Sequence, residues 1–469
     1  MTIARNGPAW RRATLVGLLV ACAAPRAGVP ASAADGPEGT RTTLRGYLES
    51  FALDREAREL LESPGSWDDD RTNLVIRTLA RIALAPPEFA VRWSEDAVAE
   101  EDLADPPEDR CVRITGTAEL VAPVDLPMGV MLGGNGRDST PRTRVDLVRV
   151  RSSRGAVVDV LTPSAPRAWP RGRAFAERAL VVGLPVAAGA GPRPATDGEG
   201  MPSGWPAEPP SLLVVATRVA WPRDDLAGRG GMDAGLFDTV TDGAKLTSGD
   251  ADAFFGLLAA AGRTDPGALL EAAGRPRPIL PLIDPARHWF ADHRGEPVAI
   301  EGTALRATRV EIDDPVRRRQ TGIDHYWEVF VSVATPPIEV EGKVMDRYPV
   351  VCCLRALPEG MPTGTSIAEP VRVAAFAFKS YAWPLPSADG TPRRREAPLL
   401  VGGDVSRMRP AASPRGGVLE WMLTGLAAVI ALGFAAAWWM ARREARQRDR
   451  RRRASLPDRL SPPGAPPGG

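Results

Sequence analysis

Lysine and histidine are scarce in this chain of 469 residues, which contains three of each. Arginine therefore supplies nearly all of the 59 basic side chains, a bias that we attribute to coding composition rather than to function. Two histidines, His288 and His293, are five residues apart, which on a helix separates them by about 140° and makes them poor joint ligands. The third, His325, stands at the start of an expected strand. We therefore predict no metal site and no cofactor.

The sequence also lacks the usual motifs of hydrolases and nucleotide-binding enzymes. None of the patterns H-E-x-x-H, G-x-S-x-G and G-x-x-x-x-G-K-[ST] occurs in it. We assign no catalytic residue on this ground. The side chains that remain available for an active site are His325, Glu328, Cys352 and Cys353. An exported hydrolase or redox protein that uses these four residues is the alternative to a protein without enzymatic activity.

Cysteine is rare as well, with four residues in the chain. Cys22 falls within an export signal, which leaves Cys111, Cys352 and Cys353. An odd number in an oxidising compartment leaves at least one cysteine unpaired or bonded to another molecule. Cys352 and Cys353 are strand neighbours that face opposite ways, so a bond between them is strained and we expect small, buried apolar side chains. A bridge from Cys111 to the second domain stays open if the two domains dock closely.

The N-terminus has the pattern of an export signal. Arginines precede an apolar run at 13–24, and Ala31-Ser32-Ala33 supplies small residues for a signal peptidase. This predicts a signal peptide over residues 1–33. An alternative processing site is Leu19-Val20-Ala21-Cys22, which is similar to a lipobox and would make Cys22 the lipidated first residue.

A second apolar run, from Trp421 to Met440, lies near the C-terminus. A helix of 20 residues is about 30 Å long, which matches the hydrocarbon thickness of a bilayer. An arginine-rich stretch follows it at once and is expected to stay in the cytoplasm. The sequence thus predicts a single-pass protein of the cytoplasmic membrane with a large extracytoplasmic N-terminal region and a cytoplasmic C-terminal tail.

The charge of this protein differs between the predicted compartments. Residues 1–33 carry +4 and residues 441–469 carry +6, and subtracting both from the total of +1 leaves −9 for residues 34–440. Phosphates dominate the affinity of proteins for nucleic acid, so an acidic outer region argues against a nucleic-acid partner.

The outer region repeats one order of features twice. The tripeptide Gly-Thr-Ala at 116–118 recurs at 302–304, an offset of 186. Four further residues recur at an offset of 192: Pro170, Gly172, Ala176 and Glu177 match Pro362, Gly364, Ala368 and Glu369.

Each copy contains five segments rich in Val, Ile, Leu and aromatic residues and bounded by Gly and Pro, the pattern of short strands. The expected strands are 111–124, 143–153, 155–163, 178–187 and 211–221 in the first copy, and 297–311, 325–335, 347–357, 371–383 and 398–408 in the second. Gly116 and Gly302 allow the first strand to bend sharply. Five strands in about 110 residues predict an OB-like barrel, with another small barrel or sandwich as the alternative.

The predicted fold class is mainly β with helical additions: two OB-like five-stranded β-barrel domains, small helical segments and one C-terminal transmembrane helix. The 46 glycines and 47 prolines argue against a helical bundle. The expected divisions are a signal peptide (1–33), a helical N-terminal region (34–109), OB-like β-barrel 1 (110–223), a helical connector (224–295), OB-like β-barrel 2 (296–410), a linker (411–417), the transmembrane helix (418–440) and a basic disordered tail (441–469).

Residues 296–408 resemble a segment of uncharacterised bacterial envelope proteins. The motifs that carry the resemblance are Tyr348-Pro349-Val350-Val351, the stretch Leu-Pro-Glu-Gly-Met-Pro-Thr-Gly at 357–364 and the stretch Glu-Pro-Val-Arg-Val-Ala at 369–374. The first copy departs from this pattern, with Arg178 where the second has Pro370. The resemblance implies the layout of an envelope protein with an OB-like segment, and it implies no activity.

From location and fold we predict a membrane-anchored extracytoplasmic binding or scaffolding protein. The expected partners are the cytoplasmic membrane, through the C-terminal helix, and an envelope protein or a glycan, through the loops of the barrels.

Overall fold

The computed structural model describes residues 43–51, 59, 69–100, 110–126, 143–186, 212–340, 343–385, 393–408 and 414–454. The predicted signal peptide, with Cys22, and residues 455–469 of the predicted tail lie outside them. The chain divides into two compact units, Met1–Met408 and Arg409–Gly469.

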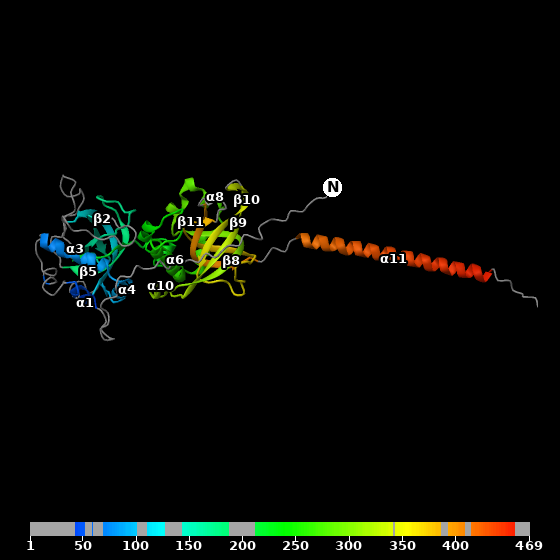
Figure 1. Cartoon of the computed structure of the whole chain (residues 1–469), viewed down its shortest axis with the longest axis horizontal. Coiled ribbons are helices and arrows are strands. Elements are labelled where there is room, and N and C mark those ends of the chain that lie inside the picture. Colours follow the sequence, from blue (N-terminus) through cyan, green and yellow to red (C-terminus); the bar gives the residue numbers. More distant parts are fainter. Residues whose placement is uncertain are drawn as a thin grey trace, which may run out of the picture. The chain divides into compact units, whose positions relative to one another are not determined.

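The first unit begins with short helices and continues into a sheet, coloured from blue through cyan to green in Figure 1. Its elements are α1 (Leu44–Glu49), α3 (Asp69–Ala83), α4 (Pro87–Glu95), β1 (Val98–Ala99), β2 (Val112–Asp125), β3 (Arg144–Ser152), β4 (Val157–Thr162), β5 (Glu177–Val186), β6 (Leu212–Val215) and β7 (Val219–Ala220).

Short helices and a second set of strands follow, coloured green to orange (Figure 1). They are α5 (Leu226–Arg229), the 3-10 helix η3 (Ala234–Thr239), α6 (Ala251–Arg263), α7 (Pro266–Ala273), α8 (Leu280–Ile283), the 3-10 helix η4 (Pro285–Arg287), α9 (Trp289–His293), β8 (Pro297–Glu311), α10 (Pro315–Thr321), β9 (His325–Val340), β10 (Lys343–Leu354), β11 (Glu369–Leu385) and β12 (Arg393–Arg407).

Both sets of strands close into five-membered rings with one topology. The first ring runs β2-β3-β4-β6-β5 and closes through the β2 and β5 pairing, and the second runs β8-β9-β10-β12-β11 and closes back on β8. In each ring the third and fifth strands are parallel, and all other neighbours are antiparallel. This is the strand order of an OB-like Greek-key barrel, so the predicted fold class is confirmed. We call the two rings barrel 1 and barrel 2.

The two barrels share local details at the two offsets that the sequence contains. The first strand bulges between Ala118 and Leu120 in barrel 1 and between Ala304 and Arg306 in barrel 2. The loop that joins the third and fourth strands bonds to this bulge. Its amides at Gly172 and Phe175 donate to Val121 and Glu119 in barrel 1, and those at Gly364 and Ile367 donate to Ala307 and Leu305 in barrel 2, over 2.8 to 3.0 Å. Gly172 and Gly364 both have positive φ.

Close packing of strands explains the glycine in the first strand of each barrel. A Cβ on Gly116 would lie 2.1 Å from the carbonyl oxygen of Arg151, and one on Gly302 would lie 2.5 Å from that of Ser332. The missing side chain lets the first strand bend against the second, as the sequence predicts.

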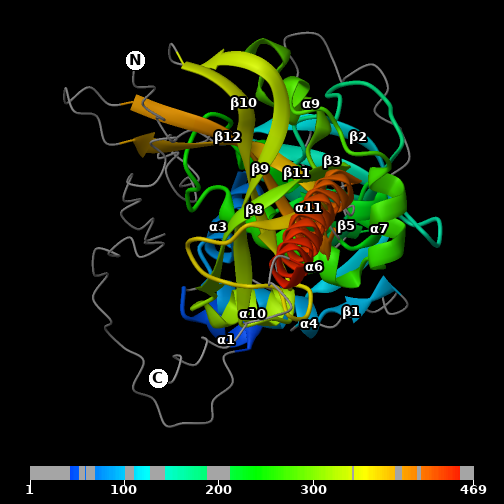
Figure 2. The ribbon, with the colours of Figure 1, turned by 90° about the vertical axis from the view of Figure 1, so that its right-hand side faces the viewer.

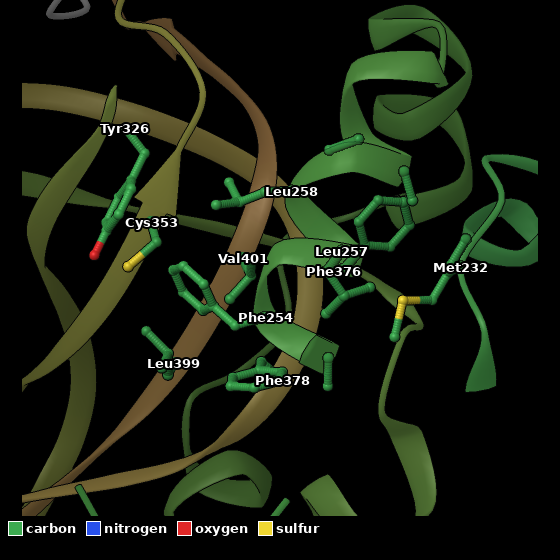
Figure 3. Packing of buried hydrophobic residues seen from close by; sticks show 14 of the residues in the cluster. Met232, Phe254, Leu257, Leu258, Tyr326, Cys353, Phe376, Phe378, Leu399 and Val401 are labelled. Carbon is green, nitrogen blue, oxygen red and sulfur yellow. The ribbon is translucent and has the colours of Figure 1, made fainter. Parts of the chain in front are cut away.

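Helix α6 covers the outer face of barrel 2 over β11 and β12. Its buried residues Phe254, Leu257 and Leu258 pack on the strands beneath them (Figure 3). The strand side chains in this cluster include Cys353, Phe376, Phe378, Leu399 and Val401. In barrel 1 the helices α1 and α3 cover the corresponding outer face.

Four of the five strands of barrel 2 are longer than the sequence predicts, because two hairpins extend from the ring, whereas β8 has the predicted bounds (Figure 2). β9 continues through Pro336 and Pro337 to Val340, beyond the expected end at 335. The prolines fall where the β9 and β10 register is irregular and no strand partner is paired with them, so no ladder hydrogen bond is lost. The parallel pairing of β10 with β12 is limited to residues 351–353 and 399–401.

The second unit contains α11 (Pro414–Ala454), drawn in orange to red in Figure 1. Within it, Thr424–Arg448 has a mean hydropathy of 1.7 over its most apolar stretch and is long enough to cross a membrane. The guanidinium groups of Arg442 and Arg443 lie 4.4 and 4.9 Å from the ring centres of Trp438 and Trp439. Residues 441–454, which the sequence places in a disordered tail, are helical, because arginine, alanine and glutamate are good helix formers.

Candidate functional site

A set of polar side chains occupies the outer face of barrel 2 where β8, β9 and β10 run side by side. It consists of Thr303, Arg306, Glu328, Ser332 and Arg347, and we call it the polar face. The strand register brings these residues to one side of the sheet. Thr303 is paired with Ser332 and Arg306 with Phe330, and Ser332 and Phe330 are two positions apart on β9, so they share a face. Without the bulge at Leu305, Arg306 would point into the barrel.

Arg306 and Glu328 form an ion pair at one end of the polar face. The Arg306 guanidinium also lies 4.3 Å from the centre of the Phe330 ring. Burial raises the pKa of Glu328, and the positive charge of Arg306 opposes this without cancelling it. The Arg306 side chain is therefore held in one position by a carboxylate and an aromatic ring.

At the other end of the polar face, the exposed side chain of Arg347 on β10 makes hydrogen bonds to both β8 and β9. Its Nε donates to Ser332 Oγ over 2.9 Å, and its Nη2 donates to Thr303 Oγ1 over 3.1 Å. Nη2 also donates to the Ser332 carbonyl over 2.8 Å. The hydroxyls of Thr303 and Ser332 and the guanidinium of Arg347 thus form a preorganised set of hydrogen-bonding groups at the surface.

The equivalent surface of barrel 1 has leucines in place of the Arg306 and Glu328 ion pair, while Thr117 and Arg151 take the places of Thr303 and Ser332. Strand register makes Leu120 the counterpart of Arg306 and Leu147 the counterpart of Glu328. Both leucines are buried, and Leu147 belongs to the cluster under α1 and α3. Barrel 2 therefore carries charge at a position where a barrel of the same topology needs none for folding.

The structure separates the four residues that the sequence leaves available for an active site. Glu328 and Cys353 are opposite each other on β9 and β10 and share the outer face. Cys352 lies on the other side of β10, among the apolar residues inside barrel 2. His325 is three residues before Glu328 on one strand, so its side chain is on the opposite face. The structure does not bring the four side chains to one site.

The three cysteines of the described residues are free and buried. Burial raises the pKa of Cys111 to about 12 and also raises the pKa values of Cys352 and Cys353. A thiol with so high a pKa is a poor nucleophile at neutral pH. The cysteines therefore pack as small apolar side chains.

His325 makes its contacts at the start of β9 and with the neighbouring strand β8. Its Nδ1 lies 2.5 Å from Asp324 Oδ1 and 3.3 Å from Nη2 of Arg309, and its ring meets Trp327 edge-on at 5.8 Å. The hydrogen bond with His325 lowers the pKa of Asp324. The described residues contain no group of three or more His, Cys, Asp and Glu side chains that could hold a metal ion.

The comparisons with known proteins add little to this geometry. No family model matches the chain, and no curated protein matches its sequence. One solved structure that is similar to part of it is the mitochondrial single-stranded DNA binding protein Rim1 from S. cerevisiae. The match is 12% identical, covers 25% of this chain and 98% of Rim1, and has a TM-score of 0.14, so it carries no argument about function. The resemblance to bacterial envelope proteins has no counterpart in these comparisons.

Proposed function

We propose that this protein is a membrane-anchored extracytoplasmic binding or scaffolding protein. Its N-terminal signal exports the chain, α11 holds it in the cytoplasmic membrane, and its arginine-rich end stays in the cytoplasm. The polar face of barrel 2 then binds an envelope protein or a glycan. The observation that carries this proposal is the replacement of the buried Leu120 and Leu147 of barrel 1 by Arg306 and Glu328 in barrel 2.

The chemistry of the polar face suits a neutral, hydrogen-bonding ligand. It offers two hydroxyls and the exposed guanidinium of Arg347, and the Phe330 ring lies against the Arg306 guanidinium; hydroxyls, guanidinium groups and aromatic rings are groups that bind sugar hydroxyls or peptide amides. The net charge of −9 over residues 34–440 disfavours nucleic acid.

Site-specific photo-crosslinking in intact cells tests this proposal. The photoreactive residue replaces Leu305, which is next to Arg306 and 46% exposed. The matched control replaces Leu270, a leucine on α7 that is 40% exposed. We expect position 305 to give a discrete adduct and position 270 to give an adduct at least about tenfold weaker. Combining Arg347→Ala with the probe at position 305 should weaken the adduct.

Digestion of the adduct identifies the class of partner. An adduct that loses its extra mass after digestion with a glycan-degrading enzyme contains a glycan. An adduct that loses it only after digestion with a protease contains a protein. Equal labelling from positions 305 and 270, or an adduct that Arg347→Ala leaves unchanged, would contradict a specific role for the polar face.

A further inference from the structure

Lys379 and Asp250 form an ion pair that is closed off from solvent. Lys379 is on β11 and Asp250 precedes α6, and their side chains are 0% and 2% exposed. The Lys379 Nζ lies 3.2 Å from Oδ1 of Asp250. The pair lies next to the apolar cluster between α6 and barrel 2, where Phe254 and Phe378 meet edge-on at 5.9 Å.

A bulge in β11 points the lysine toward this cluster. Ala377 is paired with Leu400 and Lys379 with Leu399, so Phe378 is an extra residue in the strand. The shift puts Lys379 on the side that α6 covers, where regular alternation would turn it away. The local structure therefore presents this amine to Asp250.

The choice of lysine at this position is unusual for the chain. Only Lys245, Lys343 and Lys379 are lysines, and the other 56 of the 59 basic residues are arginines. Arginine is the better partner for a buried carboxylate, because its planar fork makes two hydrogen bonds and keeps its charge. Barrel 1 follows that rule with Arg149 and Asp159. Lysine differs in being able to lose a proton and act as a nucleophile.

The other oxygen of Asp250 is held by two donors. Oδ2 accepts from the Thr247 backbone amide over 2.7 Å and from Thr247 Oγ1 over 2.9 Å. The carboxyl group also stands at the N-terminus of α6, a helix of 13 residues whose dipole favours negative charge there. Donors fixed on one carboxyl oxygen can hold the negative charge that develops there when a nucleophile attacks the carboxyl carbon.

We propose that Lys379 and Asp250 condense to an intramolecular isopeptide bond. The ammonium group of Lys379 first gives a proton to Oδ1 of Asp250, which leaves a neutral amine and a neutral acid. The Nζ lone pair then attacks Cγ, and the carbonyl electrons move to Oδ2, where the two Thr247 donors hold them. Oδ1 leaves as water with a second proton from the nitrogen, so that one ammonium and one carboxylate become one amide and one water.

The surroundings of Lys379 favour its neutral amine, which is the form that reacts. Burial lowers the pKa of Lys379, and the nearby carboxylates of Asp250 and Asp242 oppose this effect without cancelling it. Asp242 is itself occupied, since its oxygens accept from Arg294 over 2.7 Å and from the Ser380 amide over 3.0 Å. The first proton transfer is therefore between Lys379 and Asp250 directly.

The bond would fasten the connector to barrel 2. Asp250 and Lys379 are 129 positions apart in sequence. The closed loop would include α6 to α10 and most of the strands of barrel 2. A covalent link between Asp250 and Lys379 prevents α6 from separating from barrel 2 when a mechanical force acts along the chain between the membrane and a bound partner.

Peptide mapping of the purified full chain tests the proposal. Trypsin cuts an unlinked chain after Lys245, Arg263, Arg372, Lys379 and Arg393, and it does not cut at an acylated lysine. We expect a branched peptide of 246–263 joined to 373–393, with the summed mass less one water. Recovery of 246–263, 373–379 and 380–393 as separate peptides from folded protein would overturn the proposal and leave an ordinary buried ion pair.

Three controls keep this test specific. Lys379→Arg preserves the charge and cannot form the amide, so it should yield no branched peptide. Thr247→Ala removes one donor from Oδ2 and should slow formation of the link by about 100-fold. Chain recovered from inclusion bodies and kept in denaturant should stay unlinked until it is refolded, and a link present before refolding would show that the folded geometry is not its cause.

Discussion

Arg149 and Asp159 lie directly opposite each other on β3 and β4 and make two parallel hydrogen bonds in the buried outer face of barrel 1. Nε donates to Oδ1 over 2.8 Å and Nη2 donates to Oδ2 over 2.9 Å. Burial raises the pKa of Asp159 although Arg149 lowers it. At the equivalent positions barrel 2 has Phe330 and Val351. The same pair of positions in this fold is thus occupied by an ion pair in barrel 1 and by two apolar side chains in barrel 2.

This equivalence predicts the outcome of exchanging the pair. Asp159→Val alone leaves the Arg149 guanidinium buried without its carboxylate and should lower the free energy of unfolding by about 3 to 5 kcal/mol. The double variant Arg149→Phe with Asp159→Val copies barrel 2 and should recover most of that loss. Guanidinium denaturation followed by tryptophan fluorescence measures both. A double variant no more stable than the single one would show that the barrels are not interchangeable here.

The glycine of the first strand gives a second prediction. Gly302→Ala places a Cβ against the Ser332 carbonyl and should cost about 2 to 4 kcal/mol of stability, because backbone must move to accept it. Gly249→Ala is the matched control, since its Cβ would meet no atom closer than 3.5 Å. Thermal denaturation of both variants checks the difference, and equal melting temperatures would argue against the tight bend of β8.

Features that follow from local chemistry could be read from the sequence. α7 (Pro266–Ala273) starts after the capping residue Asp265 and stops before Gly274, because an Asp-Pro pair and a glycine each act within one turn. α10 has the same start, Asp314 followed by Pro315, but its sequence does not predict a helix. Its short polar sequence lacks the apolar spacing by which helices are recognised.

The polar face and the lysine pair could not be predicted, because both depend on bulges. Regular alternation along β8 and β11 would place the side chains of Arg306 and Lys379 inside the barrel instead of on its outer face. The positions of the extra residues, Leu305 and Phe378, are visible only in the strand register. In β10, which continues regularly through its end, the opposite orientation of Cys352 and Cys353 follows from alternation alone. The rarity of lysine is the one sequence signal that singles out Lys379.

The cysteines should be inert in the folded protein. With a pKa of about 12, the Cys111 thiol is almost fully protonated at pH 8, and Cys352 and Cys353 are shifted in the same direction. Since only the thiolate reacts, a disulfide reagent at pH 8 should label these three residues slowly in the native state and rapidly after unfolding in guanidinium. Absorbance of the released thiolate measures this. A fast native phase would place at least one of the three thiols near solvent.

The anchor makes the last prediction. A chain that stops after Met408 lacks α11 and should leave the membrane fraction, because we propose that the apolar stretch within Thr424–Arg448 holds the protein in the bilayer. A chain that stops after Ala454 keeps the whole helix and should stay with the membranes in alkaline carbonate, which removes proteins bound only at the surface. Fractionation and blotting of cells that make each form measure this. Carbonate extraction of the chain ending at Ala454 would mean that α11 lies on the membrane surface, and retention of the chain ending at Met408 would mean that a second segment attaches it.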